Sequence, residues 1–308
     1  MKFAPIVLFV YNRLWHTTQT VEALLQNNLA AQSDLYIYCD GAKENDSNIK
    51  VEEVREYVKS ITGFNSVKTI ERDKNWGLAD SIIDGVSEIV NKYGRVIVIE
   101  DDLVTSPFFL TYMNKALERY ETYERVMNIN GYIFDIENGL STTFFHQVPS
   151  SWGWATWSNS WNKINLSSKD LYDLILPDKQ DFDLDNSYDF FRQLKANYDG
   201  SLKTWAIKWY ATIYLNKGLC LTPHKSFVRN LGFGKDATNT KGRGVEMSRI
   251  KELNLSPLVE DIPLEYSIAE INKIKYFYNQ NRDSKILKML KWVYFDFLFP
   301  FRLMRNRK

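Results

Sequence analysis

The chain has 308 residues, of which 44% are hydrophobic and 25% charged, and its formal net charge is only +1. This length allows one large domain or two modest ones, with a sizeable core. The near-balance of charge argues against nucleic acid as the main partner. The two cysteines, Cys39 and Cys220, lie far apart and in no metal-binding spacing, so they favour a reduced, cytoplasmic setting.

The apolar amino end, residues 1–11, is short, contains Pro5 and lacks a small-residue cleavage pattern. We therefore expect a first β-strand there rather than a signal peptide. The chain has no run of about 20 apolar residues, so the sequence predicts no helix that spans a bilayer.

Strands and helices are predicted to alternate over the first 123 residues. Apolar runs predict buried strands at 5–10, 35–39, 67–70 and 95–99. An amphipathic helix should follow each strand, the first of them capped by Thr17 or Thr18 and the third ended by Gly94. Ser106 and Pro107 predict the start of another helix that runs to about residue 123. This pattern is typical of a mostly parallel α/β sheet with helices on both faces.

The strand at 95–99 ends abruptly in three acids, Glu100, Asp101 and Asp102. Three adjacent carboxylates cannot all be ionised without a positive partner. A hard divalent cation, Mn2+ or Mg2+, suits such oxygen ligands and usually shares them with phosphates. The alternative interpretation is a solvated acidic turn after a strand.

Polar side chains also follow the other predicted strands: Asn12 and Arg13, then Asp40, then residues 72–75. Because the ends of parallel strands share one edge of a sheet, we expect these side chains and the acidic triplet to converge on one site. Polar loops after strands are common, so this convergence favours a site without naming its ligand.

Neither glycine-rich phosphate-binding loop is present. The position after the first strand reads Tyr11-Asn12-Arg13, where a dinucleotide fold requires glycines, and no Walker-type loop occurs. Bound phosphates would therefore have to be neutralised by a metal ion and by basic side chains such as Arg13, Arg72 or Lys74.

The second half of the chain is rich in aromatic residues and loses the regular alternation. Trp152, Trp154 and Trp157 lie within six residues around Gly153, and their flat faces suit stacking on sugar rings. The alternative is a tryptophan-rich core segment. Residues 205–218 predict a helix and 219–221 a strand that ends at Pro223. The polar, glycine-containing segment 229–239 is interpreted as a lid or as an ordinary surface loop.

Taken together, the order of these motifs resembles that of glycosyltransferases of the GT-A fold, in particular bacterial sugar transferases similar to N-acetylglucosaminyltransferase I. The resemblance covers roughly residues 4 to 240. It is carried by the following segments: 11–13, 38–41, 75–78, 100–102, 151–154 and 230–239.

The resemblance implies an inverting transfer of a sugar from a nucleotide donor that depends on Mn2+ or Mg2+. Asp102 matches the metal-binding acid of the family, and Glu100 and Asp101 match acids that orient the donor near its ribose. Asp40 matches an acid that contacts uracil, and Arg13 a basic residue of the nucleotide pocket. Further residues are assigned to the donor (Tyr11, Asn12, Lys74, Asn75) and to the acceptor (Trp152, Gly153, Trp154, Trp205).

The sequence departs from the family where a catalytic base is expected. The matching segment, residues 205–209, contains no carboxylate. Asp236 and Asp135 are candidates for the base on chemical grounds alone. Some relatives place a metal-binding histidine near residue 239, whereas this chain has only His16, His146 and His224; we interpret the last of these as structural rather than as a ligand.

The carboxyl end, residues 285–308, combines lysines and arginines with apolar and aromatic residues. Such a segment is too short to span a bilayer but suits the membrane interface, where basic residues attract anionic lipid. A terminal helix that packs on protein is the alternative. Membrane association would fit a polyprenyl-linked saccharide acceptor.

The sequence thus predicts a nucleotide-sugar-binding half (1–125), an acceptor-binding half of the same domain (126–270) and a membrane-associating tail (271–308). We expect a glycosyltransferase of surface-glycan assembly, peripheral at the inner face of the cell membrane, with a UDP-sugar as the donor. A sugar nucleotidyltransferase and a non-catalytic, membrane-bound carbohydrate-binding protein are the alternatives.

Overall fold

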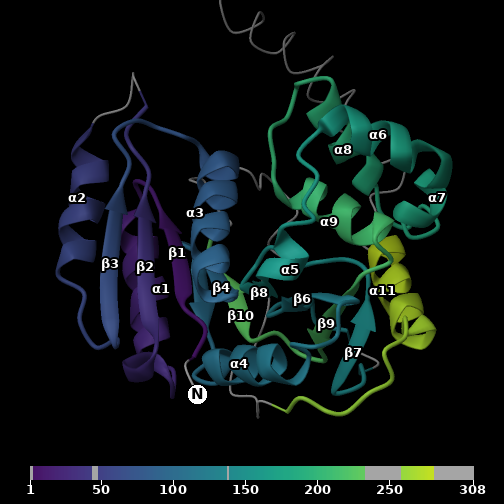
Figure 1. Ribbon diagram of the computed structural model, residues 1–308, viewed down its shortest axis with the longest axis horizontal. Coiled ribbons are helices and arrows are strands. Elements are labelled where there is room, and N and C mark those ends of the chain that lie inside the picture. The colour runs from purple at the N-terminus through teal and green to yellow at the C-terminus, as the bar shows by residue number, and fades with distance from the viewer. Residues whose placement is uncertain (1–2, 44–47, 137–138, 233–257, 281–308) are drawn as a thin grey trace, which may run out of the picture.

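In the computed structural model, residues 3–43, 48–136, 139–232 and 258–280 are described. They form one eight-stranded sheet with helices on both faces, in the strand order β3-β2-β1-β4-β8-β6-β9-β7, and a separate two-stranded ribbon, β10-β5 (Figure 1). Four of the seven strand pairings of the large sheet are parallel. The predicted fold class, a mostly parallel α/β sheet flanked by helices, is confirmed.

The first half of the chain supplies four neighbouring parallel strands. They are β1 (Ile6–Val10), β2 (Asp34–Cys39), β3 (Ser66–Glu71) and β4 (Arg95–Glu100). The connecting helices are α1 (Leu14–Leu25), α2 (Asn48–Lys59) and α3 (Leu78–Tyr93). All four predicted strands are confirmed. The chain adds β2 and β3 on one side of β1 and then returns to add β4 on the other.

The predicted helix boundaries hold in one case and fail in another. Gly94 ends α3 with a φ of +80°, the left-handed conformation that glycine adopts without strain. The predicted cap of α1 is wrong, because the helix already begins at Leu14. The hydroxyl groups of Thr17 and Thr18 instead donate to the carbonyl oxygens of Arg13 and Leu14, one turn earlier.

The helix predicted after Ser106 is shorter than expected. It is α4 (Phe109–Arg119), which ends four residues before the predicted position. The hydroxyl oxygen of Ser106 accepts a hydrogen bond from the backbone N–H of Phe108, 3.2 Å away, just ahead of the helix. Ser106 therefore binds a backbone N–H group that precedes the helix rather than one in its first turn.

The second half completes the sheet with strands of mixed direction. These are β6 (Val126–Asn130), β7 (Thr143–His146), β8 (Trp154–Trp157) and β9 (Leu219–Pro223). Its helices are α5 (Ser158–Trp161), α6 (Ser168–Ile175), α7 (Lys179–Phe182), α8 (Phe190–Tyr198), α9 (Ala206–Leu215) and α11 (Ile268–Gln280). The predicted helix after Trp205 and the strand that ends at Pro223 are confirmed, whereas β6, β7 and β8 were not predicted.

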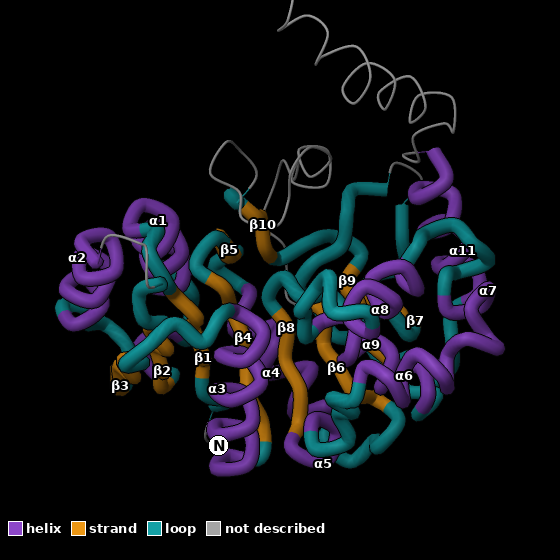
Figure 2. Tube along the Cα trace, turned by 90° about the horizontal axis from the view of Figure 1, so that it is seen from above, coloured by secondary structure: helices purple, strands orange, loops and turns teal. Residues whose placement is uncertain are grey.

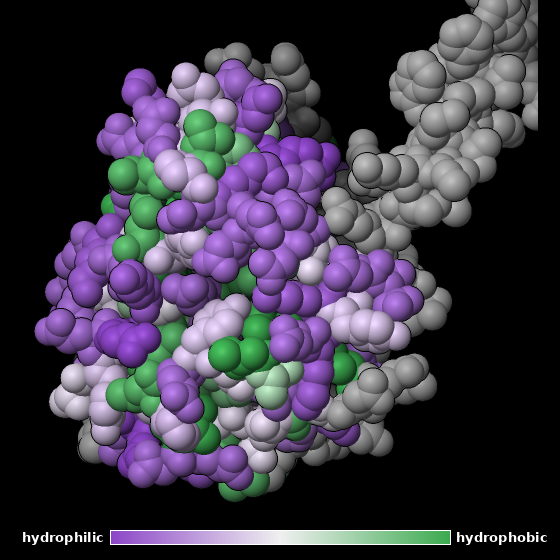
Figure 3. All heavy atoms as spheres, turned by 90° about the vertical axis from the view of Figure 1, so that its right-hand side faces the viewer, coloured by the Kyte–Doolittle hydropathy of each residue, from purple (hydrophilic) through white to green (hydrophobic). Residues whose placement is uncertain are grey.

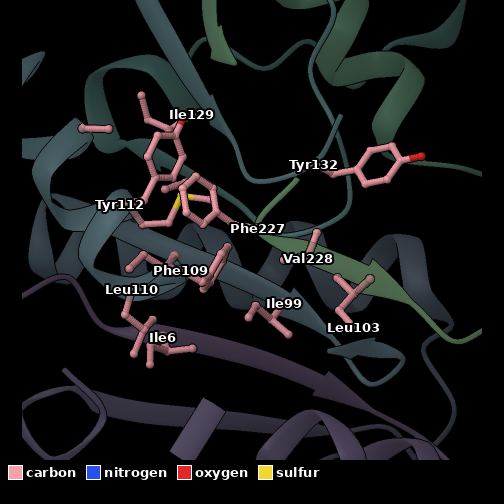
Figure 4. Close-up of a cluster of buried hydrophobic side chains, with 14 of the residues drawn as sticks. Ile6, Ile99, Leu103, Phe109, Leu110, Tyr112, Ile129, Tyr132, Phe227 and Val228 are labelled. Atoms are coloured by element: carbon pink, nitrogen blue, oxygen red, sulfur yellow. The ribbon is translucent and has the colours of Figure 1, made fainter. Parts of the chain in front are cut away.

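The helices divide between the two faces of the sheet (Figures 1 and 2). One buried cluster joins the sheet to α1, α2 and α4, and another joins it to α3, α5 and α9. Figure 4 shows the first cluster beneath the end of β4, where Ile99, Leu103, Phe109 and Val228 meet. The strand that carries the acidic triplet is therefore fixed by apolar packing on both faces.

Among the described residues, no helix is long and apolar enough to cross a membrane. The face around α6, α7 and α11 mixes hydrophilic with scattered hydrophobic side chains (Figure 3). The segment predicted to bind a membrane, 285–308, lies outside the described residues.

Candidate active site

The acidic triplet and Arg13 meet where the direction of strand addition reverses. Arg13 follows β1 and the acids follow β4, the strands on either side of this switch point. Arg13 forms an ion pair with Asp101, and its Nη2 also lies 3.0 Å from Oδ2 of Asp102. Ligands of open α/β sheets bind outside the carboxyl ends of the strands at such a point. Of the residues predicted to converge, the structure brings Arg13, Asp101 and Asp102 into direct contact here.

Two further segments hold the backbone of the triplet in place. The hydroxyl group of Thr20, on α1, donates to the carbonyl oxygen of Asp101 over 2.8 Å. The backbone N–H of Leu231 donates to the carbonyl oxygen of Asp102, also over 2.8 Å. This second bond continues the ribbon that β5 (Leu103–Thr105) forms with β10 (Val228–Asn230), beside α1 in Figure 2.

Asn230 and Gly232 surround the carboxylate of Asp102. Nδ2 of Asn230 lies 3.5 Å from Oδ1 of Asp102, and Oδ1 of Asn230 accepts the backbone N–H of Gly232 over 2.6 Å. A Cβ atom at residue 232 would overlap Oδ2 of Asp102. Only glycine therefore fits at position 232, so close to this carboxylate oxygen.

Burial strongly affects the ionisation of the triplet. Burial, followed by the charges of Asp102 and Asp101, raises the pKa of Glu100 to about 8. Burial also raises the pKa of Asp101 to about 6, although Arg13 acts in the opposite direction. For Arg13, burial disfavours the charge, but the two aspartates outweigh it and raise the pKa of Arg13 above its usual value. Arg13 is therefore the permanent cation of this site.

Asp40 organises the loop that follows β3. Its Oδ1 accepts the backbone N–H groups of Trp76 (2.7 Å) and Gly41 (3.0 Å). Its Oδ2 accepts the N–H of Gly77 (2.9 Å) and Nδ2 of Asn75 (3.0 Å). All four bonds lie within the chain, and Asp40 is only 8% exposed. Its visible role is to shape this loop, while contact with a nucleotide base stays a prediction.

The other predicted phosphate-binding side chains differ in availability. The guanidinium of Arg72 pairs with Asp84 and lies 4.0 Å from the ring centre of Trp76. The neutralisation of phosphate by Arg72 therefore stays a prediction, and in this conformation its guanidinium is paired with a side chain of α3. The side chain of Lys74 is exposed at the same edge of the sheet.

The predicted donor residues after β1 lie beside this loop. Tyr11 and Asn12 are partly buried next to Arg13. The hydroxyl oxygen of Tyr11 accepts the backbone N–H of Lys43 over 3.3 Å. The two residues therefore lie between the Asp40 loop and the acidic triplet.

The chemistry around Asp102 fits a hard divalent ion that is shared with phosphates. Its carboxylate is partly exposed, at 13%. In the part of the chain that the structure describes, no group of three or more His, Cys, Asp or Glu side chains is placed to bind a metal. This donor set suits an ion held by one or two carboxylates and completed by a ligand, as is usual for Mg2+.

The tryptophan-rich segment lies mostly in the core. Trp154 is fully buried, and its ring centre is 5.0 Å from that of Trp205 and 5.5 Å from that of Trp161. The prediction that Trp154 stacks on an acceptor sugar is wrong for this conformation, because neither face of its ring reaches the surface. For this residue, the core alternative describes the structure.

The two residues ahead of Trp154 occupy the turn into β8. Gly153 adopts a φ of +62°, and its carbonyl oxygen accepts the N–H of Gly131 over 2.7 Å. Trp152 is partly buried, with its ring edge-to-face against Tyr132 at a centre distance of 4.4 Å. Trp152 is thus the more accessible of the two predicted acceptor tryptophans in this segment.

A pocket of about 180 Å3 opens beside the start of α9. Its lining includes aromatic side chains and a few polar ones: Phe190, Trp205, Tyr210, Ser150, Ser151 and Gln193. An ion pair between Lys203 and Asp80 joins the segment ahead of α9 to the first turn of α3. The start of α9, which borders the pocket, is therefore tied to the first turn of α3.

The candidate bases are not brought together with the acidic triplet by any described contact. Asp135 is exposed, five residues beyond the end of β6, and Asp236 lies outside the described residues. His224 forms a 3.1 Å contact between Nδ1 and the carbonyl oxygen of Thr142, which agrees with a structural role.

Three residues of the site escaped the sequence interpretation: Thr20, Asn230 and Gly232. The last two belong to a segment that had been singled out as a motif, and the spacing Asn-x-Gly was the available signal. Thr20 gave no signal, because its role depends on α1 packing against the end of β4.

No protein-family model matches this chain, and no curated protein matches it significantly. Several solved structures are similar in part. The fragment 1–349 of TarS from S. aureus is 11% identical, with a TM-score of 0.43, over 75% of this chain and 61% of that fragment. A mannosyltransferase from Pyrobaculum calidifontis in complex with GDP-Man and Mn2+ is 8% identical, with a TM-score of 0.36, over 69% of this chain and 74% of that one.

A third similar structure is the galactosyltransferase LgtC with donor and acceptor sugar analogues. It is 7% identical, with a TM-score of 0.37, over 68% of this chain and 70% of that one. The chain therefore spans less than two thirds of the TarS fragment. All three TM-scores are below 0.5.

Proposed function

We propose that this protein is a metal-dependent GT-A glycosyltransferase that moves a sugar from a nucleotide-sugar donor, most simply a UDP-sugar, to a hydroxyl group of a saccharide acceptor. The observation that carries the proposal is the pairing of Arg13 with Asp101 and Asp102 across the switch point of the sheet. A cation and adjacent carboxylates at this position suit a diphosphate and its divalent ion.

Each residue of the site has a role in this proposal. Asp102 holds the Mn2+ or Mg2+ ion, which would supply the positive charge that stabilises the departing diphosphate. Arg13 pairs with the same diphosphate, and Glu100 and Asp101 orient the donor. The loop shaped by Asp40 receives the base of the nucleotide.

The pocket beside α9 is our candidate for the acceptor site. Aromatic walls with a few polar groups suit a sugar ring, which has apolar C–H faces and polar hydroxyl edges. Trp205 and Gln193 offer one group of each kind. In a single, inverting displacement, the attacking hydroxyl must lose its proton to a base, for which Asp135 and Asp236 are the candidates.

Membrane association and a lipid-linked acceptor belong to the same proposal. They rest on the basic, aromatic composition of residues 285–308. A polyprenyl-linked saccharide would bring the acceptor to the cytoplasmic membrane face, where surface glycans are assembled. Binding of the full chain to vesicles with and without anionic lipid tests this part.

Donor identity and metal use are tested by a thermal-shift screen of nucleotide sugars with and without Mn2+, followed by assays of donor hydrolysis and transfer. We expect Asp102→Asn to lower the rate by about 1,000-fold, because stabilisation of developing charge at the metal is lost. Asp173→Asn, which changes an exposed carboxylate paired with Lys169, is the matched control and should leave the rate unchanged. Full activity of Asp102→Asn would contradict the proposal.

One observation keeps a second function open. No carboxylate lies in the first turn of α9, where the family resemblance expects the base. A non-catalytic carbohydrate-binding protein would show metal-dependent donor binding without turnover. Slow donor hydrolysis by the purified protein, lost in Asp102→Asn, distinguishes the enzyme from this alternative.

A further inference from the structure

Arg13 makes a forked contact with two consecutive carboxylates. Its Nε lies 3.3 Å from Oδ2 of Asp101, and its Nη2 contacts both Oδ1 of Asp101 and Oδ2 of Asp102. The side chains of Arg13, Asp101 and Asp102 are 21%, 7% and 13% exposed, respectively. Because water screens these contacts poorly, the guanidinium fork binds the pair of acids more firmly than a surface ion pair would.

The position held by Arg13 overlaps the position that a metal ion would need. A divalent ion coordinates a carboxylate oxygen at roughly 2.1 Å. At Oδ2 of Asp102, the ion would lie beside a guanidinium nitrogen that is already 3.0 Å from the same oxygen. The two cations repel each other, so both cannot occupy this oxygen favourably.

Described residues also lie against the other sides of the Asp102 carboxylate. Oδ1 faces the amide nitrogen of Asn230 at 3.5 Å, which presents hydrogens rather than a ligand atom. The backbone of Gly232 lies so close to Oδ2 that a Cβ atom there would overlap it. Among the described surroundings of Asp102, the place that best suits a divalent ion is therefore the one that Arg13 occupies.

The backbone of Arg13 is held in place, whereas its side chain can reach the proposed donor as a second partner. The carbonyl oxygen of Arg13 accepts the backbone N–H and the hydroxyl group of Thr17, each over 3.0 Å. The side chain alone can therefore turn from Asp102 to an anion at the same edge of the sheet. A diphosphate is such an anion, and guanidinium groups bind phosphates in the same forked manner.

We propose that Arg13 is a resident counter-cation that competes with the divalent ion for Asp102 and yields only when a nucleoside diphosphate gives its guanidinium another partner. The ion and the nucleotide then bind cooperatively, each favouring the other to the same extent. This inference rests on the proposed function, because it assumes a diphosphate ligand at this site.

The test is a titration with Mn2+ in which electron paramagnetic resonance measures the free ion, carried out with and without UDP. We expect Arg13→Gln to bind Mn2+ alone at least 10-fold more tightly than the unmodified protein. Addition of UDP should raise the Mn2+ affinity of both proteins. The gain should be at least 10-fold larger for the unmodified protein than for Arg13→Gln. Asp102→Asn should abolish Mn2+ binding in both backgrounds.

Arg119→Gln is the matched control, because it also removes an arginine from an ion pair, here with the exposed Asp261. It should leave both Mn2+ affinities unchanged. If Arg13→Gln does not fold, Arg13→Lys, which keeps the charge but loses the fork, should bind Mn2+ alone more tightly than the unmodified protein but less than 10-fold.

Equal or weaker Mn2+ binding by the Arg13 variants would overturn the inference, as would a gain that Arg119→Gln shares. This result is distinguishable from failure of the proposed function, which is judged by donor hydrolysis. A chain that hydrolyses nucleotide sugars but shows no gain in Mn2+ affinity on loss of Arg13 keeps the function and loses the counter-cation.

Discussion

The two halves of the large sheet use polar side chains in opposite ways. In the half made of β3, β2, β1 and β4, the polar residues follow the strands and gather at one rim, where Arg13 meets Asp101 and Asp102. In the half made of β8, β6, β9 and β7, polar residues lie inside the sheet layer and are buried. In the first half, polar side chains remain available to a ligand. In the second half, they form hydrogen bonds within the fold.

The buried polar residues of the second half form one connected chain. Trp209 donates to Asn128 over 3.0 Å, Asn128 to Asn130 over 2.7 Å, and Asn130 to the hydroxyl oxygen of Thr222 over 2.7 Å. Nε2 of His146 lies 2.7 Å from the same hydroxyl oxygen. Burial lowers the pKa of His146 to about 3, so the imidazole is neutral.

This chain of hydrogen bonds fixes the wall of the pocket beside α9. Oδ1 of Asn130 accepts the backbone N–H of Ser150 over 2.7 Å, and its Nδ2 lies 3.1 Å from the carbonyl oxygen of Val148. Nδ1 of His146 accepts the N–H of Val148 over 3.1 Å. Buried polar groups of the second half thus position the wall of the pocket beside α9, whereas Arg13 and Asp102 at the rim of the first half are partly exposed.

The largest effect that would test this contrast is on stability in the second half. We expect Asn130→Ala to lower the free energy of unfolding by about 3 kcal/mol, since it leaves several buried partners without hydrogen bonds. Urea unfolding measures this change. The control is Asn216→Ala, which removes an exposed side chain at the end of α9 that donates to the carbonyl oxygen of Thr212, one turn earlier. Equal losses for the two variants would show that the network adds nothing to stability.

A smaller loss of stability is expected at Asp40, a rim residue whose hydrogen bonds stabilise the fold. Asp40→Ala should cost about 2 kcal/mol of unfolding free energy, because three donors in the loop after β3 and the N–H of Gly41 lose this acceptor. The affinity for UDP should fall in parallel, as measured by calorimetry. Asp73→Ala, an exposed residue of the same loop, is the control. A loss of UDP affinity without a loss of stability would instead mean that Asp40 acts on the nucleotide itself.

The same contrast explains how far the sequence could be interpreted. The strands of the first half are short apolar runs between turn signals, and parallel pairing brings their ends together, so both the sheet and the rim residues were predictable. In the second half, β6 contains Asn128 and Asn130 inside a strand that is buried throughout. An apolar pattern cannot reveal such a strand, because the asparagines are satisfied by partners from distant parts of the chain.

The site was predictable as a set of residues but not as a set of partners. The sequence identified Arg13 and the triplet, yet it assigned Arg72 to phosphate, whereas the structure pairs it with Asp84 on α3. It predicted that Trp154 stacks on an acceptor sugar, whereas neighbouring aromatic rings bury this side chain. In both cases the deciding contact comes from another element, and the residue type alone does not show which partner it will have.

The smallest expected effect concerns the pH dependence of the rim. The pKa of Glu100 is raised to about 8 in the folded protein, from an ordinary value of 4.5, chiefly by burial. Between these values the folded state keeps a proton that the unfolded chain has lost. This contribution to stability is complete below pH 4.5 and is lost as the pH rises through 8. In metal-free protein, stability should therefore decline over this window.

Replacing Glu100 by Gln removes this titration. We expect Glu100→Gln to match the unmodified protein at pH 4.5 and to exceed it at pH 9, because it avoids the cost of a buried charge. Since the side chain of Glu100 is partly exposed and water screens its charge, we expect a difference of only about 1 kcal/mol, less than the full shift of the pKa would give. Urea unfolding at several pH values in the presence of a chelator measures the difference. Glu53→Gln, an exposed residue on α2, should leave the pH profile unchanged. A pH profile of Glu100→Gln that parallels that of the unmodified protein would mean that Glu100 is ionised at neutral pH, and that Arg13 then neutralises a triplet with its full charge.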